Sequence, residues 1–302
     1  MIIKKQEYFN GFRDRVIFGE KAAYYLSKKL KNIGVEVNDD ENQSISEDAF
    51  YLSEEDLSRL LKNINFNYKP VRDECDFYHA ASEIKSQINS RHLKNGVKFL
   101  SLSDTYIDEN VIIGKETMIY PNTYLEGKCE VGDNCVIGPE SKIVNSTINS
   151  DTNVLKSVIM ESVIGSHCNI GPFAYIRPES NIGDHVKIGD FVEIKKSVIK
   201  ENTKISHLAY IGDSEVGRGC NISCGVITAN YDGKRKYKTT IGDNAFIGCN
   251  VTMVAPVTIE SDTYIAAGST ITETVKSNSL AIARERQTNK EDWVIKKGFK
   301  KD

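Results

Sequence analysis

The sequence lacks a long apolar run. None of its stretches reaches the roughly 18 apolar residues that a membrane-spanning helix needs. The N-terminal stretch MIIKKQEYFNGF also lacks the apolar core and the small-residue cleavage site of a secretory signal peptide. Both absences argue against secretion and against membrane anchoring. We therefore expect a cytoplasmic protein with no membrane partner.

Cysteine pairs of the CxxC type are missing as well, and so is an excess of basic charge. The seven cysteines are an odd number, so the sequence predicts neither a disulfide framework nor a zinc site made of four thiolates. The 39 lysines and arginines are balanced by 42 aspartates and glutamates, which leaves a formal net charge of −3. Nonspecific nucleic-acid binding is therefore not expected, and any bound phosphate must be held by a local cluster.

Residues 1–83 predict a small α-rich or α/β module whose role the sequence does not indicate. Helices are expected over 20–33, 53–64 and 73–93. Nine acidic residues and no basic one fall within 35–58, a pattern that is typical of a solvated linker or of an acidic docking surface. Residues 84–106 are expected to form a helical linker to the next domain.

A six-residue period begins at residue 107. Aliphatic residues recur at every sixth position, and the period continues with some five-residue steps to about residue 275. The first run comprises Ile107, Ile113, Ile119, Leu125, Val131, Ile137 and Ile143. This period is typical of a parallel β-helix, in which each hexad forms one side and three hexads form one coil. We predict a mainly β domain over 107–275, followed by a C-terminal tail over 276–302.

Two further positions of the hexad carry a pattern. The second is often glycine, which suits a corner where the backbone turns sharply. The fifth is small or β-branched, which suits inward packing. Four cysteines occupy this fifth position and are expected to be small core residues: Cys129, Cys135, Cys168 and Cys220.

Stacked coils predict a cluster of cations. Four first-position residues should lie one coil apart, and the residue that follows each of them should face outward. These following residues form one column: Arg177, Lys195, Gly212 and Ala229. Arg177 and Lys195 should lie about 5 Å apart, the spacing of neighbouring strands. The hexad pattern then breaks over ANYDGKRKYKTT, so a loop that carries Lys236 leaves from the same corner. An arginine and two lysines at one edge predict a phosphate site, with solvated surface charge as the alternative.

Histidines provide a second candidate centre. His207 occupies the third position of its hexad and should face outward near Tyr210 and Asn221, where a neutral imidazole can act as a general base. His167 and His185 are 18 residues apart and should stack. Histidines at subunit contacts raise a metal site as an alternative, but His207 has no second histidine near it in sequence, and we expect no metal.

At these residues the sequence resembles a known family. The segments RPESNIGDHVKIGDFVEIKKSVI, SHLAYIGDSEVG, NISCGVITANYDGKRKYKTTIGDNAFIG, MVAPVTI, IAAGSTIT and LAIARERQ occur in order. They resemble the acetyltransferase half of the bifunctional N-acetylglucosamine-1-phosphate uridyltransferase/glucosamine-1-phosphate acetyltransferase family. The resemblance implies a left-handed β-helix, a homotrimer, and acetyl transfer from acetyl-CoA to the amino group of glucosamine 1-phosphate, without a metal.

The resemblance also implies a role for each matching residue. The phosphate ligands are Arg177, Lys195 and Lys236, and the sugar contacts are Tyr210 and Asn221. The catalytic base is His207, with Glu193 as its polarising partner. The acetyl-CoA contacts are Asn230, Tyr231, Cys249, Ala267 and Arg284. Relatives often carry serine where this chain has Cys249, so a hydroxyl hydrogen bond to the coenzyme would be lost there.

The family's other half is not recognisable. Its glycine-rich nucleotide loop, followed by Arg and a Pro-Lys pair, has no counterpart in residues 1–83. We expect no uridyl transfer by this chain and a separate uridyltransferase as its partner.

Three questions stay open at this point. The chain could be a trimeric β-helix scaffold without turnover, or it could acetylate another amino-sugar 1-phosphate. Cys224 and Cys249 are candidate nucleophiles, although no adjacent base motif supports them. The basic tail from Arg284 onward either helps to hold the coenzyme's phosphates or is a frayed end.

Overall fold

The computed structural model describes residues 74–299 and four short strands before them. These strands are β1 (Ile3–Lys4), β2 (Val16–Ile17), β3 (Glu20–Lys21) and β4 (Ile45–Ser46). β1 pairs with β4 in parallel, and β2 pairs with β3 in antiparallel orientation. The helix expected over 20–33 is wrong at Glu20 and Lys21, which lie in β3. The described residues do not include the rest of that helix or the helix expected over 53–64. Of the acidic stretch 35–58 they include only β4.

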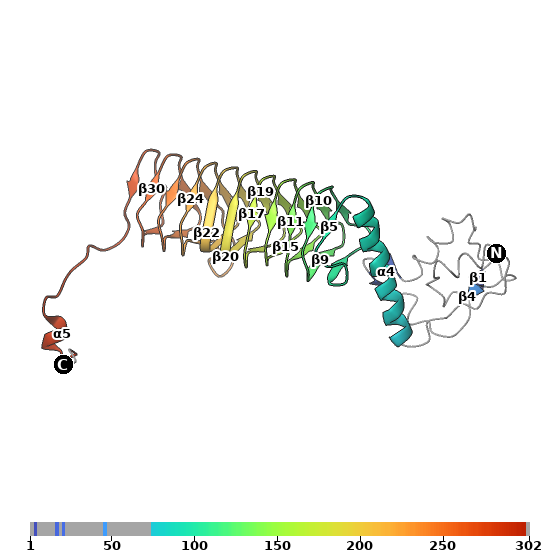
Figure 1. The fold of residues 1–302 in the computed structure, drawn as a ribbon. Coiled ribbons are helices and arrows are strands. Elements are labelled where there is room, and N and C mark those ends of the chain that lie inside the picture. The colour runs from blue at the N-terminus through green and yellow to red at the C-terminus, as the bar shows by residue number, and fades with distance from the viewer. Residues whose placement is uncertain (1–2, 5–15, 18–19, 22–44, 47–73, 300–302) are drawn as a thin grey trace.

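The third expected helix is confirmed as α4 (Glu74–Lys94). Its apolar face covers the first end of the solenoid through buried residues Ala80, Ile84 and Ile88 (Figure 1). The amide of Asn89 donates hydrogen bonds to the carbonyl oxygens of Leu102 and Thr105, at 2.8 and 3.0 Å. The helix runs across residue 84, so the expected boundary at that residue falls inside one continuous element.

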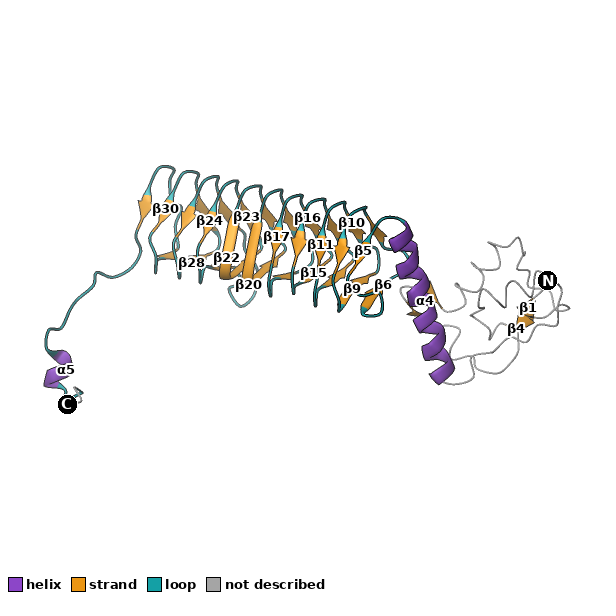
Figure 2. Cartoon of the chain, in the orientation of Figure 1, coloured by secondary structure: helices purple, strands orange, loops and turns teal. Residues whose placement is uncertain are grey.

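The solenoid consists of 28 short strands in two sheets (Figure 2). The sheet of nine holds β7 (Ile112–Ile113), β10 (Glu130–Val131), β13 (Thr147–Ile148), β16 (Val163–Ile164), β19 (Asn181–Ile182), β21 (Val198–Ile199), β23 (Ser214–Val216), β26 (Thr239–Ile241) and β29 (Val257–Ile259). The sheet of nineteen holds β5 (Lys98–Phe99), β6 (Thr105–Ile107), β8 (Met118–Ile119), β9 (Thr123–Glu126), β11 (Val136–Ile137), β12 (Lys142–Val144), β14 (Asn153–Val154), β15 (Val158–Met160), β17 (Asn169–Ile170), β18 (Tyr175–Ile176), β20 (Lys187–Lys195), β22 (Lys204–Gly212), β24 (Asn221–Ile222), β25 (Ile227–Ala229), β27 (Phe246–Ile247), β28 (Thr252–Val254), β30 (Tyr264–Ile265), β31 (Thr270–Ile271) and β32 (Leu280–Ala281).

All strand pairs of the solenoid are parallel, and each strand pairs with its equivalent one coil away. The mainly β, left-handed parallel β-helix is thereby confirmed. Its strands begin at Lys98 and end at Ala281, beyond the expected limits of 107 and 275 at both ends. β20 and β22 are nine residues long and continue through a corner, so the sheet of nineteen covers two faces of the solenoid.

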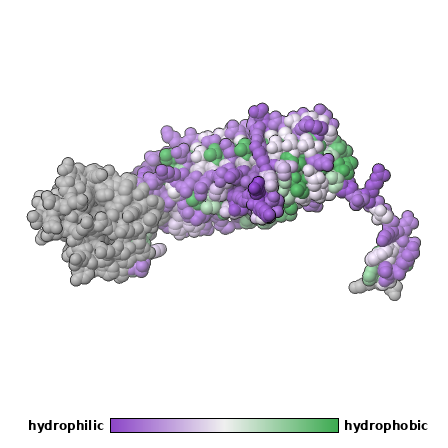
Figure 3. Space-filling model, turned by 180° about the vertical axis from the view of Figure 1, so that it is seen from behind, coloured by the Kyte–Doolittle hydropathy of each residue, from purple (hydrophilic) through white to green (hydrophobic). Residues whose placement is uncertain are grey.

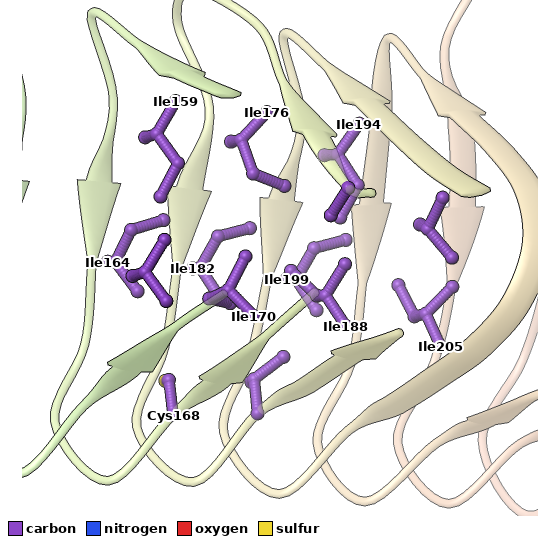
Figure 4. Packing of buried hydrophobic residues seen from close by; sticks show 14 of the residues in the cluster. Ile159, Ile164, Cys168, Ile170, Ile176, Ile182, Ile188, Ile194, Ile199 and Ile205 are labelled. Carbon is purple, nitrogen blue, oxygen red and sulfur yellow. The ribbon is translucent and has the colours of Figure 1, made fainter. Parts of the chain in front are cut away.

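The first position of each hexad builds the core. Rows of isoleucine side chains from successive coils lie on top of one another inside the solenoid (Figure 4). Burial of each such side chain contributes about 1.5–3 kcal/mol to folding. The core also continues through 144–161, where the period weakens in the sequence, because Ile148, Val154 and Ile159 are buried. Five-residue steps in this segment leave out the third position of the hexad and keep the inward residue in register.

The fifth position of the hexad also points inward, as expected. Cys129, Cys135, Cys168 and Cys220 are buried. Burial raises the pKa of all four thiols, and that of Cys168 to about 11. These four cysteines are therefore inert core residues.

The role expected for the second-position glycines is corrected by the backbone. Most corners turn through a left-handed residue at the fourth position, such as Asn134 (φ 56°) and His185 (φ 57°). Glycine at the second position serves a different purpose. At Gly189 a Cβ atom would collide with the backbone carbonyl of Ser206 in the next coil. Glycine there permits close stacking of coils, and it does not make the turn.

The remaining features concern the ends and the surface. After β32 the chain leaves the solenoid as an extended segment that reaches helix α5 (Trp293–Lys296) (Figure 1). Hydrophilic side chains cover most of the visible solenoid face, with small apolar patches between them (Figure 3). In the described part of the chain, no helix combines the length and the apolar character that crossing a membrane requires.

Candidate functional site

The expected cation column is present on the outside of one corner. The register of β18, β20 and β22 places Ile176 beside Ile194 and Lys195 beside Gly212. The amide of Arg177 donates a 2.8 Å hydrogen bond to the carbonyl of Ile194. Arg177 and Lys195 are therefore direct neighbours in adjacent coils.

Arg177 is held in place by an acidic side chain. Its Nη1 atom lies 2.7 Å from Oε1 of Glu193, and its guanidinium carbon lies 5.7 Å from the ring centre of Tyr175. The hydrogen bond that Arg177 donates to Glu193 raises the pKa of Arg177 above its usual value. Within the described residues, Nε of Arg177 is buried without a hydrogen-bond partner. One donor of the guanidinium thus stays unused.

Lys236 joins this corner from the loop between β25 and β26. Tyr231 and Lys236 form an antiparallel bridge, and the amide of Tyr237 donates to the carbonyl of Asn230 at 2.8 Å. Contact with Lys195 holds the pKa of Lys236 below its usual value, while Asp213 partly opposes this effect. The two ammonium groups are therefore close enough to repel each other, and an anion between them would relieve that repulsion.

The same loop is fixed at its base. The Asn230 amide donates to Oδ2 of Asp213, and Asn230 is buried. At its tip, Oδ1 of Asp232 accepts hydrogen bonds from the amides of Lys234 and Arg235, at 2.7 and 2.6 Å. Tyr231 is 60% exposed and donates its hydroxyl to the carbonyl of Gly233. The loop is thus an ordered hairpin that presents Lys236 to Lys195.

His207 lies on the neighbouring corner and pairs with a carboxylate that the sequence did not suggest. Asp190 on β20 is the register partner of His207 on β22, and Oδ1 of Asp190 lies 2.6 Å from Nδ1 of His207. The hydrogen bond from His207 lowers the pKa of Asp190. Glu193, the partner expected for His207, contacts Arg177 instead. That expected contact is therefore wrong in this structure.

Above His207, the third-position column continues through small side chains. Backbone hydrogen bonds of 2.8 Å join Asn250 to Cys224 and Gly268 to Cys249. Cys224 and Cys249 are exposed, and Ala267 follows them in the next coil. A Cβ atom on Gly268 would lie 3.6 Å from Cδ of Arg284, so Arg284 reaches the end of this column.

The structure thus groups the expected acetyl-CoA residues in two places. Cys249, Ala267 and Arg284 gather on the His207 corner, whereas Asn230 and Tyr231 lie in the hairpin of the other corner. Asn221 lies one coil above Lys204, and its amide donates to Oγ of Ser223 at 3.3 Å. Within one chain, Asn230 and Tyr231 are therefore separated from the Cys249 column.

β20 and β22 connect the two corners. Asp190 and His207 pair at one point of the register, and Glu193 and Tyr210 pair three residues further along. Lys195 of the cation cluster follows Asp190 by five residues, which span at most about 17 Å of strand. The imidazole and the cation cluster therefore lie at opposite ends of one short face.

The stacking of the other histidines is confirmed. The rings of His167 and His185 are 4.7 Å apart between centroids, with planes 7° from parallel. Among residues that the structure describes, no group of three or more histidines, cysteines, aspartates or glutamates is arranged to hold a metal ion.

Two residues near the site, Asp190 and Asp213, are not among those that the sequence predicts, and Cys224 is predicted only as a candidate nucleophile. A usable signal existed for Asp190, which lies 17 residues before His207. Because one hexad of that coil has five residues, this distance is one full coil. The same count places Cys224 one coil after His207. The same signal existed for Asp213, which lies 17 residues before its partner Asn230.

Comparison with known proteins gives matches along most of the chain. The model of the GMPPB C-terminal domain matches residues 104–180, and that of the bacterial transferase hexapeptide (six repeats) matches residues 238–273. Bifunctional protein GlmU of Acetivibrio thermocellus is 57% identical over 229 residues, which cover 76% of this chain and 50% of the relative. Bifunctional protein GlmU of Clostridium novyi is 49% identical over 270 residues, which cover 86% and 59%.

A solved structure, the UDP-N-acetylglucosamine acyltransferase from Campylobacter jejuni, aligns with 62% of this chain and 71% of its own, with a TM-score of 0.38 and 14% identity. The chain spans about half the length of the curated relatives it matches. These relatives confirm the resemblance predicted from the motifs, and the chain is a homologue of bifunctional protein GlmU over about half of that protein's length.

Proposed function

We propose that the chain transfers an acetyl group from acetyl-CoA to the amino group of glucosamine 1-phosphate. The observation that carries this proposal is the pairing of two centres on one face: a cluster of three cations and a carboxylate-paired imidazole. The substrate carries an anionic phosphate on C1 and an amine on the adjacent C2. These two groups match the two centres in chemistry.

The cation cluster would bind the phosphate. Arg177 offers a donor fork with one unused N–H, and Lys195 and Lys236 supply two ammonium groups that repel each other without an anion. Tyr210 and Asn221 would contact the sugar from β22 and β24. Glu193 holds the guanidinium of Arg177 in position.

His207 would be the catalytic base. Its imidazole removes a proton from the substrate amine, whose nitrogen then attacks the thioester carbonyl and forms the new C–N bond. As the tetrahedral intermediate collapses, the C–S bond breaks and the protonated imidazole returns the proton to the leaving CoA thiolate. This route needs neither a covalent acyl-enzyme nor a metal, and any oxyanion would be stabilised by a nearby amide.

Acetyl-CoA would lie along the column above His207. Cys224, Cys249 and Ala267 are small, so a thin pantetheine arm fits over them, and Arg284 supplies a cation for the phosphates of the coenzyme. Within one chain, Asn230 and Tyr231 lie on a different corner from this column. They would therefore contact the acetyl group of a coenzyme that is bound along the column of a neighbouring copy.

The working assembly would be a cytoplasmic homotrimer. An exposed apolar row follows the His207 corner: the rings of Phe173 and Phe191 stack with centroids 5.5 Å apart, and Leu208 is 57% exposed in the next coil. A row of this kind is typical of a protein interface. The missing nucleotide loop in residues 1–83 supports uridyl transfer by a separate partner.

The test is a thiol-release assay with acetyl-CoA and a panel of amino-sugar 1-phosphates. We expect CoA release with glucosamine 1-phosphate and no pyrophosphate release when UTP is supplied. Faster turnover of another amino sugar would change the acceptor. No CoA release with any of them would identify a scaffold, and pyrophosphate release would contradict the separate uridyltransferase.

A further inference from the structure

The carboxylate that pairs with His207 has been given no step of its own in the proposed reaction. Asp190 and His207 are direct register partners on β20 and β22, the two longest strands of the solenoid. Both strands continue through the corner, so the backbone at both residues is held by parallel ladder hydrogen bonds. The relative position of the two side chains is therefore fixed by the fold.

We infer that Asp190, rather than Glu193, is the residue that positions His207 for proton transfer. This inference rests on the acetyl transfer proposed above. Asp190 accepts a 2.6 Å hydrogen bond from Nδ1 of His207, slightly shorter than the usual charge-assisted N–H···O hydrogen bond. Glu193 is engaged by Arg177 at 2.7 Å and so belongs to the phosphate end of the site.

The hydrogen bond selects the tautomer of the imidazole. A carboxylate can only accept, so Nδ1 must carry the hydrogen and Nε2 must carry the lone pair. The side chain of His207 is 59% exposed, which leaves Nε2 open to a substrate amine. The ring is therefore both oriented and prepared as a base.

The same carboxylate stabilises the product of proton transfer. When His207 takes up the substrate proton, the imidazolium faces the negative charge of Asp190. Other charged or titratable groups around the pair are Lys187 and Lys204, on the same two strands, and the thiol of Cys224 in the coil above. Asp190 is thus the only carboxylate among these groups, and removing its charge should weaken the base.

A competing role for Asp190 is to bind the ammonium form of the substrate. That role predicts a higher KM for the amino sugar with little change in kcat. A positioning role predicts the opposite: a lower kcat, an unchanged KM, and an acid limb of the pH profile that moves to lower pH. The two roles are therefore separated by one set of kinetic measurements.

The experiment compares Asp190→Asn with the parent protein and with Asp151→Asn. The control residue Asp151 lies 3.9 Å from Nε2 of His167 on a different corner, so its variant removes a similar carboxylate from a histidine outside the site. We expect Asp190→Asn to lower kcat by about 10- to 100-fold, the range for loss of a charge-assisted hydrogen bond, without a change in KM. Asp151→Asn should match the parent.

A second readout does not depend on turnover. The imidazole signal of His207 is followed by NMR as a function of pH and is assigned by its loss in His207→Gln. In Asp190→Asn its titration midpoint should move to lower pH. An unmoved midpoint, or a moved midpoint with unchanged kcat, would overturn the inference. If the parent protein is inactive with every amino sugar, the proposed function fails, and the NMR titration still decides whether Asp190 controls His207.

Discussion

At the scale of single residues, the proposed function assigns binding and proton transfer to different groups. Arg177, Lys195 and Lys236 offer only charge and hydrogen-bond donors, whereas His207 can exchange a proton. Lys195 neighbours both other cations, and His207 stands on a separate corner. Substitutions at these two positions should therefore affect different kinetic constants.

His207→Ala should lower kcat by at least about 100-fold, because general-base assistance is typically worth 10²- to 10⁴-fold. Stability should hardly change, since the side chain is largely exposed and its removal opens no core cavity. Steady-state kinetics and a thermal melt check both points. A variant with parental kcat would remove His207 from the chemistry, and one that melts early would give it a packing role.

Lys195→Ala should raise the KM for the sugar phosphate and leave the KM for acetyl-CoA unchanged. The reason is that Lys195 faces Arg177 and Lys236, away from the column that would hold the coenzyme. Lys142→Ala is the matched control, because Lys142 is a half-exposed lysine of the same sheet whose ion pair with Glu126 lies outside the site. Equal weakening of both ligands by Lys195→Ala would place the cation cluster elsewhere in the mechanism.

Residues also show where sequence reasoning succeeded and where it failed. The coil length predicted that Arg177 and Lys195 are neighbours, because stacking depends only on the number of residues between them. The sequence did not predict Asp190 as the partner of His207. Three full hexads give a coil of 18 residues, but the coil between these two residues has 17. The approach of Lys236 to Lys195 was expected, but the hairpin that achieves it depends on local contacts such as those of Asp232 with the amides of Lys234 and Arg235, which no period encodes.

At the scale of elements, α4 closes the first end of the solenoid with a buried titratable group. His92 is buried, and its Nε2 atom has no hydrogen-bond partner in the part of the chain that is described. Burial lowers the pKa of His92 to about 4, with a smaller effect from Arg91 and an opposing one from Glu109. The folded protein therefore keeps this imidazole neutral at pH values where an unfolded chain would protonate it.

This difference predicts an acid-sensitive cap. Between about pH 6.5 and pH 4 the unfolded state binds more protons than the folded state, so the stability of the protein falls as the pH drops through that window. Above about pH 6.5, His92 makes no contribution to the pH dependence of stability. His92→Phe should remove this part of the pH dependence. Thermal melts of parent and variant at pH 7.5 and pH 5 check it, and an identical loss of Tm in both proteins would exclude His92 as the cause.

The third-position column predicts selective thiol chemistry. Cys224 and Cys249 are exposed, whereas four cysteines of the fifth position are buried with raised pKa values. A thiol reagent should therefore label Cys224, Cys249 and the exposed Cys75 first. Acetyl-CoA should protect Cys224 and Cys249 and leave Cys75 reactive, as mass spectrometry of the labelled peptides can measure. Equal protection at Cys75 would indicate a general effect of the ligand on the protein.

At the scale of the whole molecule, the solenoid was the most predictable part. Its core repeats the same inward residue in every coil, so a sequence period determines the fold without knowledge of distant contacts. The extent was less predictable. β5 and β32 lie outside the periodic segment yet extend the sheet, because Phe99 and Ala281 are the register partners of Ile119 and Ile265 and pack partly buried against the core.

The apolar row on the His207 corner predicts how copies associate. Phe191→Asp should weaken the proposed trimer of 33.8 kDa chains and reduce turnover together with it, because a charge would be buried against a neighbouring copy. Val163→Asp, on β16 in the sheet of nine, is a control with a similarly exposed apolar side chain on another face. Analytical ultracentrifugation at several concentrations measures the effect, and a stable trimer in Phe191→Asp would place the interface elsewhere.

The five-residue steps of the solenoid show which position of the hexad is free to carry functional side chains. These steps omit the third position of the hexad, and the coils still close and stack, so the fold can do without a residue there. His207, Asp190, Cys224 and Cys249 all occupy that dispensable position. Mutations in this column are therefore free of the constraint that the core imposes on its neighbours, and the same scaffold can acquire or lose a reaction without losing its shape.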